Sequence, residues 1–284
     1  MRELFQVWGN TRMVVLTAIC AAAYVAILVP FKAFTLIPGF TEIRPAAAIP
    51  VALSFLFGPA AAWGSAFGNL IGDVLGGTLG PGDLPGFAGN FLYGYLPYAV
   101  WRAFMGHAHP LASGVKGWIA YALAVATACL ACGSVIGWGV DLMGLVPFAA
   151  LGVIIVVNNL IVSAAIASVL VALLYGRVRD WGLLYFQIME EERDEPPEET
   201  SPPGPSEGAK TAGRFAGARN VARFGAVLCI AGALAAFFAG LAISGGLHTG
   251  FGATAFAGGA KGTTTLAAGM APGLTMMLIG AALL

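Results

Sequence analysis

The sequence predicts an all-α integral membrane protein with three parts: a six-helix bundle (residues 1–180), a linker (181–218) and a two-helix transmembrane hairpin (219–284). Of 284 residues, 58% are hydrophobic and only 10% are charged, which lies far outside the range of soluble globular domains. The apolar residues gather in runs of about 20 residues, the length that crosses a bilayer as a helix. One long polar run, EEERDEPPEETSPPGPSEG, lacks large apolar side chains. It therefore predicts a disordered cytoplasmic linker.

Eight apolar segments follow one another along the chain, and Gly-Pro or Gly-Gly pairs mark several of their ends. The second segment is short, since its residues would make only about 20 Å of helix. A region rich in glycine, threonine and alanine separates the last two segments and predicts an outer loop. The segments span residues 13–34, 45–57, 60–75, 87–104, 117–139, 146–175, 221–244 and 266–284.

The basic residues predict the orientation of these spans in the membrane. If the N-terminus is cytoplasmic, only Lys32, Arg44 and Lys261 lie outside, so 14 minus 3, or 11, of the lysines and arginines lie inside. Cytoplasmic loops carry an excess of lysine and arginine. The sequence thus predicts a multi-pass protein of the cell (plasma) membrane with its N-terminus in the cytoplasm.

The acidic residues of the bundle gather at the outer ends of the predicted spans. Between Arg12 and Gly176 the chain has no others than Glu42, Asp73, Asp83 and Asp141. Polar groups at membrane depth are costly unless they face a protein interior or a cavity, so they mark functional sites by default. A polar cluster that opens to the outside predicts a pocket that captures a solute.

Four polar residues around the second and third spans are candidate binding residues. Asn69 and Asp73 are four positions apart and share a helix face. A buried carboxylate needs a partner, so Asp73 pairs with Arg44, caps a loop or meets the ligand. Glu42 and Arg44 precede a helix that starts with proline, and they form either an interfacial ion pair or a lid over the pocket.

The later spans add four further candidates. Asn90 and Tyr93 lie on one face of the fourth span, and Tyr93 and Trp138 fall in the outer half of the membrane, where an aromatic side chain can line a pocket. Asn158 and Asn159 lie near mid-membrane in the sixth span. At least one of them should face the interior, either holding helices together or forming the pocket floor.

Small residues recur at helical spacing in two spans, which predicts close helix packing. The two series are the alanine stripe (Ala18, Ala22 and Ala26) and the glycine ladder (Gly64, Gly68 and Gly72). The helix that packs against the alanine stripe is either internal or in another subunit.

Several functions lack the residues they need. The chain has no phosphate-binding loop, no Ser/His/Asp arrangement and no metalloprotease pattern. The net charge of +0 gives no bulk attraction for nucleic acid. We expect no enzyme activity, no cofactor and no metal site. His107 and His109 lack a third ligand, and Cys129 and Cys132 fit plain packing better than redox chemistry in this apolar helix.

The runs TEIRPAAAIP, LFGPAAAWGSAFGNLIGD, LGPG and GFAGNFLYGYLPY, together with six spans and the alanine stripe, resemble substrate-binding S components of energy-coupling factor (ECF) transporters. The resemblance covers about residues 10–180 and points to a subgroup of unassigned substrate; the hairpin lies outside it. It implies capture of a vitamin-like or heterocyclic solute from outside. It also implies partners in separate chains, namely a transmembrane coupling subunit and two ATPase subunits.

The same resemblance implies roles for particular residues. The alanine stripe would contact the coupling subunit, and Glu42 and Arg44 would belong to a gating loop. Four residues would line the pocket: Asn90, Tyr93, Trp138 and Asn158.

Two alternatives stay open. One is uptake of a transition metal of the cobalt or nickel type, with the hairpin as an accessory unit that uses His248. The other is a membrane thiol-redox or scaffold protein that uses Cys129 and Cys132.

Overall fold

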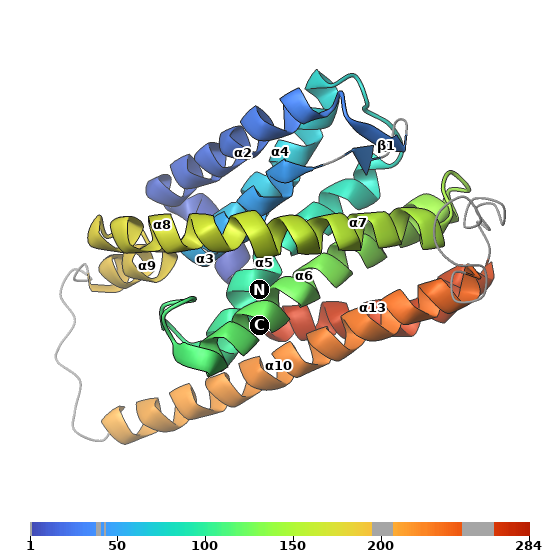
Figure 1. The fold of residues 1–284 in the computed structure, drawn as a ribbon. Helices are drawn as coiled ribbons and strands as arrows, with labels where there is room; N and C mark the ends of the chain where they lie inside the picture. Colours follow the sequence, from blue (N-terminus) through green and yellow to red (C-terminus); the bar gives the residue numbers. More distant parts are fainter. Residues whose placement is uncertain (1, 38–40, 43, 195–206, 246–263) are drawn as a thin grey trace.

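A computed structural model describes the chain except residues 1, 38–40, 43, 195–206 and 246–263. Long helices packed side by side make up nearly all of it (Figure 1). Of the described residues, only Thr35–Ile37 (β1) and Thr41–Glu42 (β2) form strands. The helices are α1 (Arg2–Gln6), α2 (Thr11–Phe31), α3 (Ala48–Phe57), α4 (Pro59–Leu75), α5 (Asp83–Met105), α6 (Gly114–Leu142), α7 (Phe148–Val162), α8 (Ser168–Asp180), α9 (Tyr185–Asp194), α10 (Glu207–Ile243) and α13 (Thr264–Leu283), with short 3-10 turns at Val7–Gly9 and Pro45–Ala47.

Five helical segments of the described chain are long and apolar enough to cross a membrane: those containing α2, α6, α7 with α8, α10 and α13. This confirms the predicted all-α integral membrane protein. The other three predicted spans correspond to α3, α4 and α5, and most of their side chains are buried against other helices. Helices that face protein rather than lipid need less hydrophobicity, so their glycine, asparagine and tyrosine content is tolerated.

The predicted sixth span is one continuous helical run with a local irregularity. Between α7 and α8, residues Ser163–Ala167 form a π-helical turn. Such turns widen the helix by one residue and often lie at functional positions. Here Ser163 is fully buried and faces Tyr93 of α5.

The glycine ladder packs α4 tightly against α2, as its spacing predicts. A Cβ atom added to Gly64 would lie 2.4 Å from Cys20 Cβ, and one added to Gly72 would lie 2.5 Å from Leu28 Cδ2. Gly68 meets Tyr24 in the same way, at 2.9 Å. Only glycine allows this approach, so these positions are fixed by helix packing.

The alanine stripe lies on the opposite face of α2. Ala18, Ala22 and Ala26 are all exposed, and so are the neighbouring Val15 and Ile19. The stripe therefore has no partner helix within the described part of the chain.

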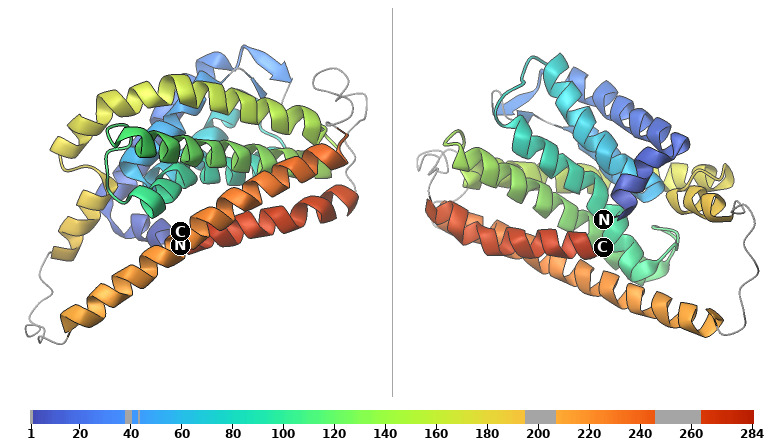
Figure 2. Two further views of the ribbon diagram at one scale, coloured as in Figure 1. Left: turned by 60° about the horizontal axis from the view of Figure 1, so that its bottom comes forward. Right: turned by 180° about the vertical axis from the view of Figure 1, so that it is seen from behind.

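The hairpin of α10 and α13 docks on the far side of the bundle, against α5, α6 and α7 (Figures 1 and 2). The ring of Phe148 at the start of α7 contacts Phe237, with 5.9 Å between ring centroids, and a Cβ on Gly240 would lie 2.5 Å from Phe148. The hairpin thus leaves the alanine stripe uncovered. The predicted outer loop of the hairpin, with His248 and Lys261, lies mostly outside the described residues.

The predicted linker starts too early. Trp181 to Asp194 contain α9, and this segment folds back on the bundle, where Leu184, just before α9, and Ile188 within it are each 1% exposed. The apolar run LLYFQIM explains the difference, because it supplies an amphipathic face just before the acidic run. The helix α10 also begins before residue 219, at Glu207.

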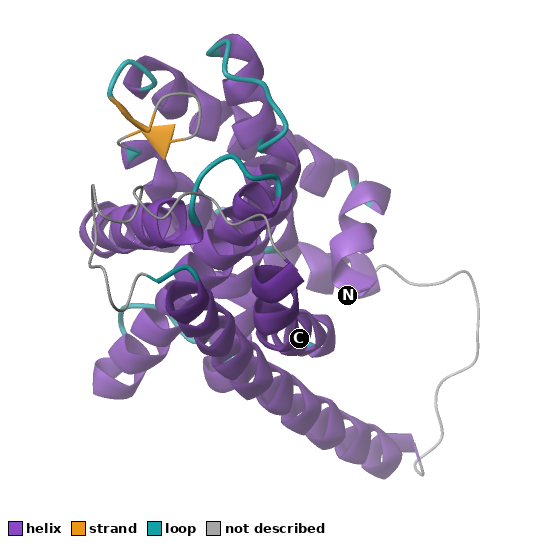
Figure 3. Cartoon of the chain, turned by 90° about the vertical axis from the view of Figure 1, so that its right-hand side faces the viewer, coloured by secondary structure: helices purple, strands orange, loops and turns teal. Residues whose placement is uncertain are grey.

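The segment between α2 and α3 contains two short strands. Its strands β1 and β2 pair in antiparallel fashion. Figure 3 shows this ribbon among the loops at one end of the bundle. Arg44 lies two positions after the last residue of β2 and leads into the turn that precedes α3.

Candidate functional site

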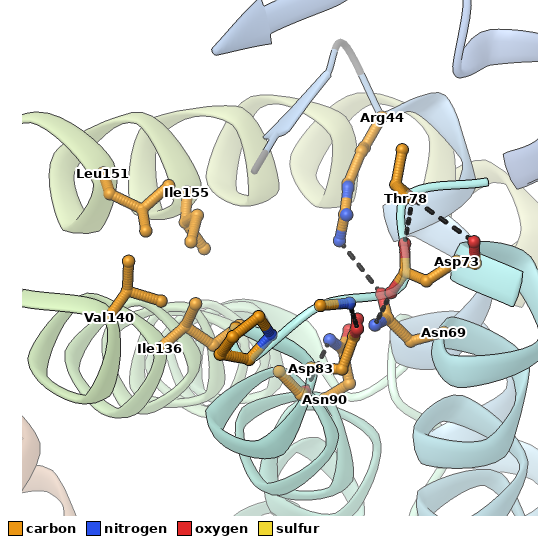
Figure 4. Close-up of a pocket in the computed structure, with 14 residues that line it drawn as sticks. Arg44, Asn69, Asp73, Thr78, Asp83, Asn90, Ile136, Val140, Leu151 and Ile155 are labelled. Carbon is orange, nitrogen blue, oxygen red and sulfur yellow. Dashed lines mark hydrogen bonds between the residues drawn. The ribbon is translucent and has the colours of Figure 1, made fainter. Parts of the chain in front are cut away.

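A cavity of about 90 Å³ opens at the end of the bundle where α4, α5, α6 and α7 meet. By the predicted orientation this is the outer end, so we call the cavity the outer pocket. Figure 4 shows its two unlike sides. Polar side chains lie on one side: Arg44, Asn69, Asp73, Thr78, Asp83 and Asn90. Aliphatic side chains lie on the other: Ile136, Val140, Leu151 and Ile155.

A chain of hydrogen bonds organises the polar side. Arg44 Nη1 donates to Asn69 Oδ1 at 3.1 Å, and Asn69 Nδ2 donates to Asp73 Oδ2 at 2.7 Å. The other carboxylate oxygen of Asp73 accepts from Lys32 Nζ at 2.6 Å. Asn69 and Asp73 are 3% and 6% exposed. The buried charges are thus paired and hydrogen-bonded, as buried ions must be.

Asp83 is a second carboxylate at the pocket. It is the first residue of α5, four residues before the predicted span begins at Phe87, and it accepts a hydrogen bond from the backbone N–H of Gly80. Burial raises the pKa of Asp83, and the nearby Asp73 carboxylate adds to this, against the opposing effects of the Gly80 N–H and Lys32. The side chain keeps acceptor capacity because an ionised carboxylate offers about four lone-pair sites.

Asn90 projects from α5 into the same pocket. Its Nδ2 donates to the Gly86 carbonyl at 2.9 Å, and its Oδ1 accepts from the Tyr24 hydroxyl at 3.4 Å. An amide has two donor hydrogens and an acceptor oxygen. Asn90 can therefore still bond to a ligand while its orientation is fixed by α2 and α5.

The structure brings together four of the eight predicted binding residues, namely Arg44, Asn69, Asp73 and Asn90. Asn158 lies next to them, since its Oδ1 accepts from the backbone N–H of Arg44 at 3.4 Å. For Glu42, the side chain lies outside the described residues.

Tyr93 and Trp138 are not brought to the pocket. The Tyr93 hydroxyl donates to the Ala47 carbonyl at 3.0 Å and lies 2.6 Å from Ser163 Oγ, one helical turn further into the membrane than Asn90. Trp138 lines a separate apolar groove with Leu84 and Pro85. Both residues are on the predicted helices, but neither lines the cavity.

Sequence reasoning missed Lys32, Thr78 and the aliphatic wall as parts of this site. A lysine at the end of a span is normally read as an orientation signal, and aliphatic pocket residues look like any other membrane side chains. The acidic cluster at the outer ends did point to Asp83, although its loop position gave it no defined role.

The two cysteines of the redox alternative are buried, with Cys129 at 0% and Cys132 at 1% exposure, and both are free thiols. A redox thiol must reach its reactant, so this environment favours packing. Among the described residues, no three His, Cys, Asp or Glu side chains gather as a metal site; His248 is not among them.

The sequence model of one protein family, described as QueT transporter, matches residues 14–176. The match is more than half of the chain, and it includes the alanine stripe, the glycine ladder and every residue that lines the outer pocket. The hairpin of α10 and α13 lies beyond it. No curated protein and no solved structure matches the chain.

Proposed function

Since the chain belongs to the QueT transporter family, whose members are S components of ECF transporters, we propose that its outer pocket captures a queuosine precursor from outside the cell. Queuosine carries a deazaguanine base, which is a flat heterocycle with hydrogen-bonding groups along its edge. The proposal narrows the small solute of an ECF S component to one chemical class.

The two-sided lining of the outer pocket is the observation that supports this substrate class. Ile136, Val140, Leu151 and Ile155 offer an aliphatic surface against which a planar ring packs. Opposite them, a few convergent polar groups can form hydrogen bonds with the edge of the ring. Small-molecule sites usually combine an apolar lining with a few such polar groups.

Each polar group has a distinct role by its chemistry. The Asp83 carboxylate accepts hydrogen bonds from ring or amino N–H groups, and the Arg44 guanidinium donates to a carbonyl oxygen. Asn90 can do both. Arg44 comes from the segment between β2 and α3, and this segment, with Glu42, closes over the bound ligand. Asn158 of α7 holds the segment in place by accepting a hydrogen bond from the Arg44 backbone.

Tyr93 and Trp138 contribute indirectly. Tyr93 ties α5 to the start of α3 and to the π-helical turn. Trp138 lines the apolar groove with Leu84 and Pro85, and it does not line the outer pocket.

The exposed alanine stripe supports a partner in a separate chain. A row of alanines lets another helix approach closely, and the hairpin leaves this row open. We infer that Ala18, Ala22 and Ala26 contact a transmembrane coupling subunit, that two ATPase subunits in separate chains supply the energy, and that the N-terminus faces the cytoplasm.

Binding of a queuosine-precursor base to the purified protein tests the proposal, by native mass spectrometry and calorimetry. We expect one bound base per chain and affinity reduced roughly tenfold or more by Asn90→Ala, because a polar contact to the ligand is lost. Asn220→Ala is the matched control, since Asn220 is exposed on α10. Binding of metal ions with no binding of the base would favour the metal-uptake alternative and refute the proposal.

A further inference from the structure

Lys32 is a buried lysine that sits beside the outer pocket without lining it. It follows the last residue of α2, and its side chain is 9% exposed. Its Nζ lies 2.6 Å from Asp73 Oδ1, whose side chain is 8% exposed, and 2.8 Å from Thr78 Oγ1. A lysine is rarely buried unless it is paired, so the burial of Lys32 depends on its contacts with Asp73 and Thr78.

The packing of α2 on α4 fixes where Lys32 lies. Cys20, Tyr24 and Leu28 lie over successive members of the glycine ladder, and Lys32 takes the next position in the same series, over Gly76. A Cβ on Gly76 would lie 2.1 Å from Lys32 Cδ. The aliphatic stem of Lys32 therefore crosses α4 where glycine leaves room for it, and the ammonium group is delivered to Asp73.

Asp73 passes this constraint on to the pocket. Its Oδ1 accepts from Lys32 and lies 3.2 Å from Thr78 Oγ1, while its Oδ2 accepts from Asn69. With both carboxylate oxygens engaged by protein donors, Asp73 is poorly placed to bind a ligand itself. Its bond to Asn69 Nδ2 instead turns Asn69 Oδ1 toward Arg44.

We propose that Lys32 is a positioning residue of the outer pocket: through Asp73 and Asn69 it holds the Arg44 guanidinium where a ligand meets it, and so ties ligand affinity to the outer end of α2. This inference rests on the proposed function of the pocket as the substrate site. It adds that Lys32, which the ligand does not touch, sets the affinity for the ligand. Lys32 lies at the end of α2, the helix that carries the alanine stripe.

Removing the ammonium group disturbs the whole series of contacts. In Lys32→Met the stem remains, but the buried Asp73 carboxylate loses its cation, and an uncompensated buried charge is strongly unfavourable. Asp73 then gains by turning toward water or toward Arg44. Either change breaks the geometry that presents Arg44 to the ligand.

The first test compares base affinity across a double-variant cycle in monodisperse protein well below its unfolding temperature. We expect Lys32→Met to weaken binding roughly tenfold or more, the scale of a misplaced charged hydrogen bond. In an Asp73→Asn background, the same substitution should change the dissociation constant less than about twofold, since its target is gone. Exposed Lys116→Met is the matched control. Equal affinities for the wild type and Lys32→Met would overturn the proposal.

A second perturbation leaves every charge in place. Gly76→Ala puts a methyl group where the Lys32 stem lies, so it should weaken binding in the same direction. Gly176→Ala, which meets no atom within 4 Å, should leave binding unchanged. Full affinity in Gly76→Ala, with the displaced Lys32 seen in its structure, would contradict the proposal.

A measurement without ligand separates this inference from the proposed substrate. Lys32→Met should speed amide hydrogen exchange in residues 76–83, whose loop Lys32 binds through Thr78, relative to the wild type and Lys116→Met. Unchanged exchange would overturn the positioning role even if the base binds. If the wild type binds no base but exchange accelerates, the substrate assignment fails while the positioning role of Lys32 is upheld.

Discussion

Substitution of Tyr93 by phenylalanine separates a structural tyrosine from a ligand-binding one. Tyr93 is 1% exposed, and its hydroxyl bonds to the Ala47 carbonyl at 3.0 Å and Ser163 Oγ at 2.6 Å. Hydrogen bonds between helices in membranes contribute about 0.6 kcal/mol on average and at most about 1.7 kcal/mol. Two such bonds give an expected loss of about 1 kcal/mol, with a ceiling of about 3 kcal/mol. Because Tyr93 does not line the outer pocket, the affinity for the base should change less than about twofold.

Equilibrium unfolding of the purified protein by sodium dodecyl sulfate in mixed micelles gives the stability, and calorimetry gives the affinity. Tyr121→Phe is the matched control, since the Tyr121 hydroxyl is buried without a hydrogen-bond partner in the described structure. Its removal should not lower the free energy of unfolding. Tenfold weaker binding with unchanged stability in Tyr93→Phe would refute this reasoning and extend the ligand site inward to Tyr93.

Three further outcomes follow from the structure. Ala22→Trp, on the exposed face of α2, should leave base binding intact but abolish uptake in cells that contain the coupling subunits; loss of binding would show that the stripe serves the fold instead. Because the pKa of Asp83 is raised, its carboxylate takes up a proton at higher pH than an ordinary aspartate, and base affinity should fall on acidification. Asp83→Asn should flatten this dependence of affinity on pH. An unchanged slope in the variant would exclude Asp83 as the titrating group. Gly64→Ala places a Cβ 2.4 Å from Cys20 Cβ and should destabilise the protein by about 1–3 kcal/mol, measured by the same unfolding assay, with Gly176→Ala as a neutral control.

Much of the fold could be predicted, and so could the convergence of half of the candidate binding residues on the outer pocket, because both depend on spacing and topology. The glycine ladder had to pack closely wherever its helix lay, and the polar residues at the outer ends had to meet once neighbouring spans crossed in opposite directions. Arg44, Asn69, Asp73 and Asn90 converge for that reason. Their individual bonds could not be predicted in this way, since Asp73 pairs with Lys32 and Asn90 bonds to Tyr24 and Gly86.

Tyr93 and Trp138 could not be placed in the same way, because the depth of a residue in the membrane does not determine the direction in which its side chain points. Asn90 and Tyr93 share one face of α5, yet one turn of helix separates the open cavity from the packed interior under the π-helical turn. Trp138 is on α6, two positions from both Ile136 and Val140, yet those two residues line the outer pocket while Trp138 lines the separate apolar groove. Such choices follow from helix rotation, which tertiary packing sets.

The helix α2 shows how binding and coupling can depend on one element. Successive residues on a helix are rotated by about 100°, so Ala22 and Tyr24, two positions apart, point to opposite faces. One face carries Cys20, Tyr24 and Leu28 onto the glycine ladder and ends in Lys32 beside the pocket. The other face carries the exposed alanine stripe. A shift of α2 against a coupling subunit would therefore pull directly on Lys32 and Asp73, and through Asn69 on the Arg44 side chain that we propose meets the ligand.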